Sequence, residues 1–567
     1  MEYLEQYQYW LENAPVSYRD LLESMRGNDD ALKGCFGAEL AFGTAGIRGI
    51  MGLGCNRLNE FTVRRTAQGV AKWMNATDLP KRCAIGYDSR HNSRIYAEIC
   101  AAALAETGIQ VFIYHQLAPT PMLSYAVREL DCGCGIMVTA SHNAGIYNGI
   151  KCYGADGCQM TDEPAAIVYR EIQATPYFVL PAKTFDALKT EGMISDIPMS
   201  LWNEYIDRVM QEGLNLSRVK SSGLHVLYTP LCGTGNKPVR ELFRRIGVNA
   251  DIVHSQEQPD GDFRTCPYPN PETDAALNES YKIAREIHPD LIIGTDPDAD
   301  RVAVAVPAAE GFRKLSGNEL GCVLLDYILR NLSAKGALPD GAEIVKSIVS
   351  TPLADKIAEF YGVTTKNVLT GFKYIGGEIL ELEQTGEEKK FIFGFEESCG
   401  YLKGTNARDK DAVVATMLIC EAAAYAKENG MNLGDYMDAL YRKFGCYAAY
   451  VQSVELQGIT AGDVSKAFMA NIRANTPTAV AGCSVTATVD YLTGVRKCFS
   501  CGKESQTNLP KSNVFTLELG DRGKIIFRPS GTEPKIKLYY TAVGADWTEA
   551  NERMDHFKAE MVGFLPA

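Results

Sequence analysis

Short apolar segments alternate with longer helix-like segments through most of this chain, and this alternation restricts the possible folds more than any other feature. The helix-like segments include IYAEICAAALAETG and KPVRELFRRIG, in which apolar residues recur at helical spacing. Apolar strands that alternate with helices indicate parallel or mixed sheets covered by helices. The segments predicted as strands are residues 83–88, 111–115, 135–141, 225–231, 251–255, 291–296, 302–307 and 343–350.

This alternation recurs in three successive blocks, which predicts three related mixed α/β units. The C-terminal region differs, because VFTLELGDRGKIIFRPSG alternates apolar and polar residues around Gly520 and Asp521, a pattern typical of an antiparallel hairpin. The chain has 567 residues, and at about 150 residues per domain this suggests about four domains. We therefore expect an α/β protein whose fourth domain is a smaller α+β unit, with boundaries at 1–190, 191–310, 311–448 and 449–567.

Composition and charge narrow the possible partners. The net charge of -13 argues against nucleic acid, since phosphate backbones attract basic surfaces, but it allows a small anionic substrate in a local basic pocket. No apolar run is long enough to cross a membrane, and the acidic N-terminus is unlike a signal peptide. The 17 scattered cysteines are interpreted as reduced thiols of a cytoplasmic protein. The pair Cys498 and Cys501 has no second pair nearby and is interpreted as incidental.

The segment TASHNAGIYNGIK follows an apolar strand and places Ser141 in a loop. Ligand chemistry in open α/β sheets gathers where strands end, and a serine at such a point can accept a phosphoryl group. His142 can hydrogen-bond near the hydroxyl, and Lys151 offers a movable positive charge. A glycine-rich turn is expected after Asn143. The same local sequence is compatible with a capped strand–helix turn that has no chemistry.

The segment LIIGTDPDADR places Asp296, Asp298 and Asp300 at alternate positions just after another apolar strand. Clustered carboxylates repel each other unless a cation neutralises them. An EF-hand is excluded, because Arg301 and Pro307 stand where that loop requires Gly and Glu. Three carboxylates with room for a phosphate oxygen suit Mg²⁺, whereas a solvated acidic turn is the alternative.

Two further segments could bind parts of a phosphorylated sugar. GFEES delivers Glu396 and Ser398 to a loop, where carboxylate and hydroxyl groups can hold sugar hydroxyls. RPSGT combines a guanidinium fork, two hydroxyls and a glycine amide, which together could bind a phosphate that is not transferred. An ordinary surface loop and an ordinary hairpin end remain the alternatives. The phosphate-binding residues of the second segment are Arg528, Ser530, Gly531 and Thr532.

In their order along the chain, these motifs closely resemble the α-D-phosphohexomutase superfamily. The order is FGTAGIRG (42–49), TASHN (139–143), GTDPDADR (294–301), TGFKYIG (370–376), GFEES (394–398) and RPSGT (528–532), and it spans nearly the whole chain. The start of the chain looks like that of the phosphoglucomutases, phosphomannomutases and phosphopentomutases with a long N-terminal helix. The first ~40 residues indeed show a helical pattern of Tyr, Leu and Trp.

The resemblance implies four domains around a deep central cleft and a mutase that acts through a phosphorylated Ser141. Its phosphate, with Asp296, Asp298 and Asp300, would hold one Mg²⁺, and a sugar bisphosphate would be intermediate and activator. The resemblance places Arg48, Arg301 and His142 at the reacting centre and makes Lys151 the proton carrier. It assigns sugar binding to Thr370, Glu396, Ser398 and Lys410, and binding of the idle phosphate to Arg528, Ser530, Gly531, Thr532 and Lys537.

Two departures from the family pattern matter here. Ala144 stands where many members have Pro, which loosens the turn slightly. Cys399 follows Ser398 where some members have Gly-His, so a histidine base is not available at that point and Lys151 gains weight. The expected activity is interconversion of glucose 1-phosphate and glucose 6-phosphate by a monomer or homodimer. A mannose or pentose phosphate substrate, a serine-dependent sugar phosphatase and a non-catalytic phosphosugar-binding protein are the alternatives.

Overall fold

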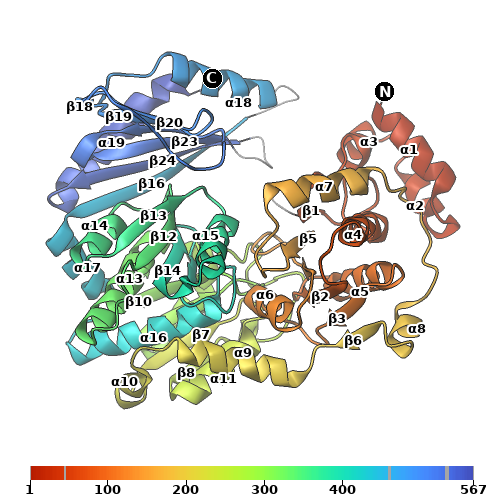
Figure 1. The fold of residues 1–567 in the computed structure, drawn as a ribbon, viewed down its shortest axis with the longest axis horizontal. Coiled ribbons are helices and arrows are strands. Elements are labelled where there is room, and N and C mark those ends of the chain that lie inside the picture. Colours follow the sequence, from red (N-terminus) through yellow and green to blue (C-terminus); the bar gives the residue numbers. More distant parts are fainter. Residues whose placement is uncertain (1, 44–45, 457–460, 530–534, 566–567) are drawn as a thin grey trace.

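The computed structural model describes residues 2–43, 46–456, 461–529 and 535–565. Four large sheets follow one another along the described chain, beside a two-stranded sheet of β17 (Ala479–Val480) and β18 (Cys483–Ser484). The units that carry the large sheets form an arc from the N-terminal unit to the C-terminal unit (Figure 1). The first three are mixed sheets covered by helices, and the fourth is antiparallel, which confirms the predicted fold class. None of the described helices combines the length and apolarity that crossing a membrane requires.

The first unit has a six-stranded sheet in the order β1-β5-β4-β2-β3-β6. Its centre is parallel, because β2 pairs with β3 and β4 in that sense, whereas β1 and β5 run antiparallel at one side. The strands are β1 (Gly46–Ile50), β2 (Arg82–Tyr87), β3 (Gln110–Ile113), β4 (Cys134–Val138), β5 (Tyr147–Gly154) and β6 (Ile194–Asp196). The helices are α4 (Glu60–Asn75), α5 (Ser93–Ala105), α6 (Thr120–Glu129), α7 (Asp162–Gln173) and α8 (Phe185–Thr190).

The second unit repeats this plan with a five-stranded sheet in the order β11-β10-β9-β7-β8. A parallel centre of β7, β8 and β9 is again extended by antiparallel strands, here β10 and β11. The strands are β7 (His225–Thr229), β8 (Asn249–Ile252), β9 (Leu291–Thr295), β10 (Val302–Pro307) and β11 (Phe312–Leu315). The helices are α9 (Met199–Gln211), α10 (Leu216–Ser221), α11 (Asn236–Ile246) and α12 (Asn278–Ile287).

The third unit has the sheet β13-β12-β14-β15, with β15 antiparallel at its edge. Helix α16 is buried along most of its length because its sequence, AVVATMLICEAAAYAKE, has almost no polar face. It packs on α9, α10 and α11 and so joins the second and third units in one core. The strands are β12 (Glu343–Ser347), β13 (Thr364–Val368), β14 (Phe391–Glu396) and β15 (Gly400–Leu402), and the helices are α13 (Gly317–Ala334), α14 (Leu353–Phe360), α15 (Phe372–Gln384), α16 (Ala412–Glu428) and α17 (Leu433–Phe444).

The C-terminal unit has a seven-stranded sheet in the order β16-β24-β23-β22-β19-β20-β21, in which every described pair is antiparallel. The hairpin predicted around Gly520 and Asp521 is confirmed as β22 and β23. The strands of the sheet are β16 (Cys446–Glu455), β19 (Ala487–Asp490), β20 (Val495–Cys498), β21 (Glu504–Gln506), β22 (Phe515–Glu518), β23 (Gly523–Pro529) and β24 (Lys535–Gly544). Its helices are α18 (Ala461–Ala474) and α19 (Trp547–Met561).

Two local expectations need correction. The N-terminal region is helical but not one long helix: it forms α1 (Glu2–Asn13), α2 (Arg19–Ser24) and α3 (Asp29–Phe36). The breaks fall at Pro15, which lacks an amide donor, and at Gly27, whose φ of 81° is left-handed. The glycine-rich turn expected after Asn143 is also short, because residues from Tyr147 onward form β5, held between β1 and β4.

Two strands lie just beyond the domain boundaries expected from sequence. Strand β6 begins four residues after the expected boundary at 190, and β11 begins two residues after the boundary at 310. Each adds a strand to the edge of the sheet before it, β6 beside β3 and β11 beside β10. Sheet pairing therefore extends the first two units by a few residues, and the division into four domains at those numbers stays a prediction.

Candidate active site

Ser141 lies in a tight loop three residues after the end of β4. Its φ of 50° is left-handed, and its backbone amide donates to Thr139 Oγ1 over 2.8 Å. The side chain is buried, and its hydroxyl donates to Asp296 Oδ2 over 3.0 Å, although the two residues are far apart in sequence. The predicted serine and the predicted carboxylate cluster are therefore in direct contact.

His142 lies beside this hydroxyl, with Nδ1 3.3 Å from Ser141 Oγ. Burial, together with the positive charges of Arg301 and Arg48, holds the pKa of His142 well below its ordinary value. The imidazole is therefore neutral at pH 7 and can accept a proton from the serine. Arg48, on β1, donates to Asn143 Oδ1 over 3.0 Å and so contacts the same loop.

The three aspartates lie in the turn between the antiparallel strands β9 and β10. Asp296 Oδ1 accepts from the backbone amides of Asp300 and Arg301, at 3.1 and 3.0 Å, and Ala299 adopts a left-handed φ of 49°. These constraints fold the turn back so that all three carboxylates face one point. One oxygen of each lies within 4.8 Å of the others, and all three residues are buried.

Two lysines from other parts of the chain partly neutralise this cluster. Lys151, on β5, lies 2.7 Å from Asp298 Oδ2 and 3.1 Å from Asp300 Oδ2, and Lys410 lies 3.1 Å from the same Asp300 oxygen. Burial alone would raise the pKa of Asp300, but Lys151 and Lys410 hold it well below its ordinary value. Burial would lower the pKa of Lys151, but Asp298 and Asp300 raise it overall, so the lysine keeps its proton at pH 7.

The carboxylate cluster still has oxygen atoms that could bind a cation. Within the described part of the chain, Asp298 Oδ1 and Asp300 Oδ1 are buried oxygens without a hydrogen-bond partner. Burial and the neighbouring charges of Asp298 and Asp300 raise the pKa of Asp296 well above its ordinary value. A buried site with orphaned carboxylate oxygens and mutually repelling carboxylates fits a hard divalent cation such as Mg²⁺.

The predicted sugar-binding residues gather at the end of β14. Glu396 accepts from the Gly371 amide over 2.7 Å, and burial next to Glu397 raises its pKa to about 7. The charge of Lys410 opposes this increase in pKa. Lys410 itself contacts the aspartate cluster through Asp300. Thr370 Oγ1 is buried and has no hydrogen-bond partner among the described residues, so it is available to a ligand. Ser398 is half-buried in the loop that follows Glu396.

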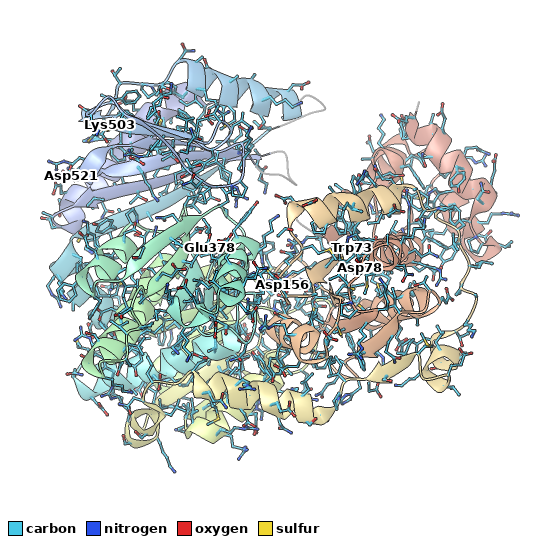
Figure 2. The ribbon with its side chains drawn as sticks, in the orientation of Figure 1. Trp73, Asp78, Asp156, Glu378, Lys503 and Asp521 are labelled. Carbon is cyan, nitrogen blue, oxygen red and sulfur yellow. The ribbon has the colours of Figure 1, made fainter. Side chains whose placement is uncertain are left out.

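The predicted phosphate-binding segment follows β23 in the C-terminal unit. Arg528 pairs in register with Lys537 of β24, which brings two cations side by side. Asp521, in the turn at the opposite end of β23, lies on the outer edge of the molecule, away from the first unit (Figure 2). Arg528 therefore lies at the other end of the sheet. The predictions for Ser530, Gly531 and Thr532 fall outside the described residues.

Comparison with known proteins shows which family has this arrangement. The family descriptions for phosphoglucomutase/phosphomannomutase α/β/α domains I, II and III match residues 39–177, 203–311 and 316–444. The chain belongs to the phosphoglucomutase/phosphomannomutase family. The phosphohexomutase resemblance inferred from the motifs is thereby confirmed, and the chain has the organisation of a phosphohexomutase-type isomerase.

Individual relatives agree with this assignment. A phosphoglucomutase of Staphylococcus aureus (strain USA300) is 37% identical over 536 residues, which cover 94% of each chain. Among solved structures, a putative phosphomannomutase of Thermus thermophilus has a TM-score of 0.67 at 20% identity, covering 93% of this chain and 99% of its own. The open form of the Paramecium phosphoglucomutase parafusin has a TM-score of 0.66 at 16% identity, covering 93% and 95%. The two structures support the fold alone.

Two residues that contact this phosphohexomutase site were not anticipated from the sequence. Glu272, in the loop before α12, forms an ion pair with Arg301 and fixes the direction of its guanidinium. Tyr539, on β24, accepts from Arg528 over 3.5 Å. Tyr539 also lies in one apolar cluster with Leu369, the residue before Thr370, and so connects the strand of Arg528 to the third unit. Only the i, i+2 spacing of Tyr539 from Lys537, which puts both on one face of a strand, could have indicated its position.

Proposed function

We propose that this phosphohexomutase interconverts glucose 1-phosphate and glucose 6-phosphate by way of a phosphoserine at Ser141. The observation that carries the proposal is the 3.0 Å contact between the Ser141 hydroxyl and Asp296, inside a buried carboxylate cluster with orphaned oxygens. A serine that had no role in phosphoryl transfer would not need such a cluster beside it. The named phosphoglucomutase relatives support the choice of glucose phosphates.

Asp296, Asp298 and Asp300 would hold one Mg²⁺ together with the phosphate carried by Ser141. When bound, the ion would neutralise charge on the phosphoryl oxygens, which is the main demand of phosphoryl transfer. The donor set supports this, because it consists of hard carboxylate oxygens, two of which have no hydrogen-bond partner among the described residues. Arg301, held by Glu272 next to Asp300, would add a further positive charge to the same centre.

The reaction moves one phosphoryl group in each direction. The P–O bond to Ser141 Oγ breaks as a bond to the free sugar hydroxyl forms, which gives a sugar bisphosphate and a free serine. The bisphosphate then turns end for end, and its other phosphoryl group returns to Ser141. In the second transfer, neutral His142 can take the proton of the serine hydroxyl when Ser141 attacks, and protonated Lys151 can donate a proton to the leaving sugar oxygen. The first transfer moves both protons the opposite way, from the sugar hydroxyl to Lys151 and from His142 to the freed serine oxygen.

Two other regions would bind the parts of the bisphosphate that are not reacting, namely the sugar hydroxyls and the second phosphate. Glu396, Ser398 and Thr370 would hold the sugar hydroxyls, with Lys410 beside them. Arg528 and Lys537 would hold the phosphate that is not transferred, together with Ser530, Gly531 and Thr532. These assignments are supported by the register of Arg528 with Lys537 and by Tyr539, which contacts Arg528 and shares an apolar cluster with Leu369, next to Thr370.

We further propose a small phosphosugar as the only substrate class, with the enzyme acting in the cytoplasm as a monomer or homodimer. A phosphomannomutase or a phosphopentomutase would use the same residues, because the substrates differ by one hydroxyl orientation or one carbon. A serine-dependent phosphatase would instead release phosphate, and a non-catalytic binding protein would need neither Ser141 nor all three aspartates.

A coupled assay with glucose 1-phosphate tests the proposal directly. Glucose 6-phosphate formation is followed with and without Mg²⁺, in the presence of a glucose bisphosphate primer, and inorganic phosphate is measured in parallel. We expect Mg²⁺-dependent isomerisation without phosphate release, and a higher kcat/KM than with mannose 1-phosphate or ribose 1-phosphate. Phosphate release would indicate the phosphatase, and a preference for another sugar phosphate would reassign the substrate.

A further inference from the structure

Arg90, which follows β2 in the first unit, places its guanidinium inside the loop that carries Ser141. Nη1 donates to the carbonyl oxygens of Ala144 and Tyr147, at 2.8 and 3.0 Å. Nη2 donates to the carbonyl oxygens of Ser141 and Asn143. One side chain thus binds four backbone carbonyls of the connection between β4 and β5. This arginine lies outside the sequence motifs that resemble the family.

Asp88, two residues earlier, is the counterion of Arg90 and is linked to the amide of Ser141 through Thr139. Asp88 Oδ2 lies 3.2 Å from Arg90 Nε and accepts from Thr139 Oγ1 over 2.6 Å. Thr139 Oγ1 in turn accepts from the Ser141 amide. Asp88 Oδ1 also accepts from the Arg90 amide and from Ser93 Oγ. The amide and the carbonyl of Ser141 are therefore both tied to one buried ion pair.

A side chain from the second unit shields this ion pair from solvent. The ring of Phe263 lies 4.9 Å from the Arg90 guanidinium carbon, and the side chains of Arg90 and Asp88 have no exposed surface. Next to it, Asp262 Oδ1 lies 2.7 Å from His91 Nε2, within hydrogen-bond distance. A guanidinium in such a dry site binds carbonyl oxygens more strongly than it would in water, and it is costly to bury unless its donors are satisfied.

The Arg90 side chain offsets two unfavourable features of the Ser141 loop. Four carbonyl oxygens converge on one buried point, where they would repel each other if no cation lay between them. The Ala144 carbonyl also accepts from the Tyr147 amide over 3.0 Å. The loop must also keep Ser141 at a left-handed φ of 50°, a conformation that is unfavourable for a non-glycine residue. A relaxed loop would lose this conformation and would turn the hydroxyl away from Asp296.

We propose that Arg90 is a positioning residue for phosphoryl transfer. It holds the backbone of the 141–147 loop so that Ser141 Oγ faces the carboxylate cluster, and it contacts neither the phosphoryl group nor the substrate. The inference rests on the proposed function of Ser141. Arg90 follows β2 whereas Ser141 follows β4, so the position of the nucleophile depends on a residue from a neighbouring strand. Phe263 of the second unit packs against that residue.

The main test compares Arg90→Lys with Arg65→Lys in the full-length protein. Lysine keeps the charge at residue 90 but cannot reach four carbonyls at once. Arg65 is the matched control: it is also buried, donates to the carbonyls of Thr175 and Gln173, pairs with Glu39 and stacks on Tyr177, yet it lies outside the serine loop. We expect Arg90→Lys to lower kcat about 100-fold with KM little changed, the loss typical of a reacting group misplaced by about 1 Å.

A second measurement separates positioning from folding and does not depend on activity. Hydrogen–deuterium exchange of residues 141–147, at equal folded fraction by circular dichroism, should rise in Arg90→Lys and stay at the wild-type level in Arg65→Lys. Phe263→Leu, which keeps an apolar residue but removes the ring, should give the same change at smaller size. Added guanidinium should restore part of the kcat of Arg90→Ala and none of that of Arg65→Ala.

Three outcomes would overturn the inference: equal kcat for the two lysine variants, a rise in KM at constant kcat for Arg90→Lys, or unchanged exchange of the loop. Absence of mutase activity in the wild-type protein would instead refute the proposed function. In that case the exchange result still decides whether Arg90 holds the loop, so the two failures are distinguishable.

Discussion

The Ser141 loop and the Arg528 end of β23 are both assigned to phosphate, but they are built in different ways. Ser141 is buried and contacts residues from two units, and its neighbours are two lysines and three aspartates in close ion pairs. Arg528 is only half-buried; among the described residues it pairs in register with Lys537 and donates to Tyr539, both on β24. Its sheet is joined to the third unit through an apolar interface.

This difference suits the two regions to different tasks, phosphoryl transfer at Ser141 and reversible phosphate binding at Arg528. The buried end is fixed by many charged contacts in a dry site, which suits a reaction that needs exact placement. The other end uses two neighbouring cations on one hairpin, which suits a group that must bind either phosphate and release it again. Changes at Ser141 should therefore affect kcat, whereas changes at Arg528 should affect KM.

The largest effect is expected from Ser141→Ala, which removes the nucleophile. Turnover should fall at least about 1,000-fold, since no other group can carry the phosphoryl group. Binding of glucose 1-phosphate, measured by calorimetry, should stay close to wild type. Ser505→Ala, at an exposed position of β21, is the control and should turn over normally. Wild-type turnover of Ser141→Ala would exclude the phosphoserine mechanism.

The carboxylate cluster should respond to loss of a single charge. Asp298→Asn keeps the size of the side chain but removes one ionised oxygen pair, so the Mg²⁺ concentration for half-maximal activity should rise about 10- to 100-fold. Titration of activity with Mg²⁺ after chelation measures this directly. Asp251→Asn, at an exposed aspartate that contacts His225 on β7, should leave the Mg²⁺ requirement unchanged. An unchanged requirement in Asp298→Asn would remove the assignment of this cluster to the metal.

The proposed role of Arg528 in binding the second phosphate is tested by substitutions at the two ends of β23. Arg528→Ala should raise KM about 10-fold or more while kcat changes little, because a charged hydrogen bond contributes about 1.5–3 kcal/mol. Arg522→Ala, in the exposed turn at the far end of the same hairpin, should have no effect on either constant. A fall in kcat of Arg528→Ala at constant KM would mean that both ends act on the reacting centre.

The smallest effect concerns the contact between the C-terminal and third units. Lys524 Nζ donates to the Ile348 carbonyl over 2.6 Å, and burial next to Lys346 lowers its pKa to about 7. Above pH 7 the folded protein binds fewer protons at this lysine than the unfolded chain, which keeps its proton up to the ordinary lysine pKa of 10.5. The free energy of unfolding should therefore rise with pH in this window, by at most about 1.4 kcal/mol per unit.

Lys524→Met should remove this contribution. Urea unfolding at pH 7.5 and pH 9 measures the pH slope in the two proteins, and the variant should show the smaller increase. The control Lys503→Met changes an exposed lysine in the turn between β20 and β21, which lies at the outer side of the same unit (Figure 2), and should keep the wild-type slope. Identical slopes in Lys524→Met and wild type would show that Lys524 stays charged in the folded protein.

Much of the site could be predicted because its signals are local. Ser141 and the three aspartates each follow an apolar strand within a few residues, so the strand pattern that predicts the sheets also predicts the loops. The hairpin around Gly520 was recognisable for the same reason, since alternation and turn residues are read from neighbouring positions. Local patterns also had limits: Pro15 and Gly27 divide the N-terminal helical region, and antiparallel pairing makes β5 from a glycine-rich segment.

The sequence by itself determined which residue types follow which strands, and therefore the fold class, the serine loop and the carboxylate turn. Only the tertiary structure decided which of these meet. Lys151 and Asp298 are 147 positions apart, and Ser141 and Asp296 are 155 apart. Arg90 reaches Ser141 because β2 and β4 are adjacent and parallel, which brings their carboxyl ends to one edge of the sheet. Such contacts depend on how sheets and units pack, and packing is set by burial summed over the whole core, which no short segment records.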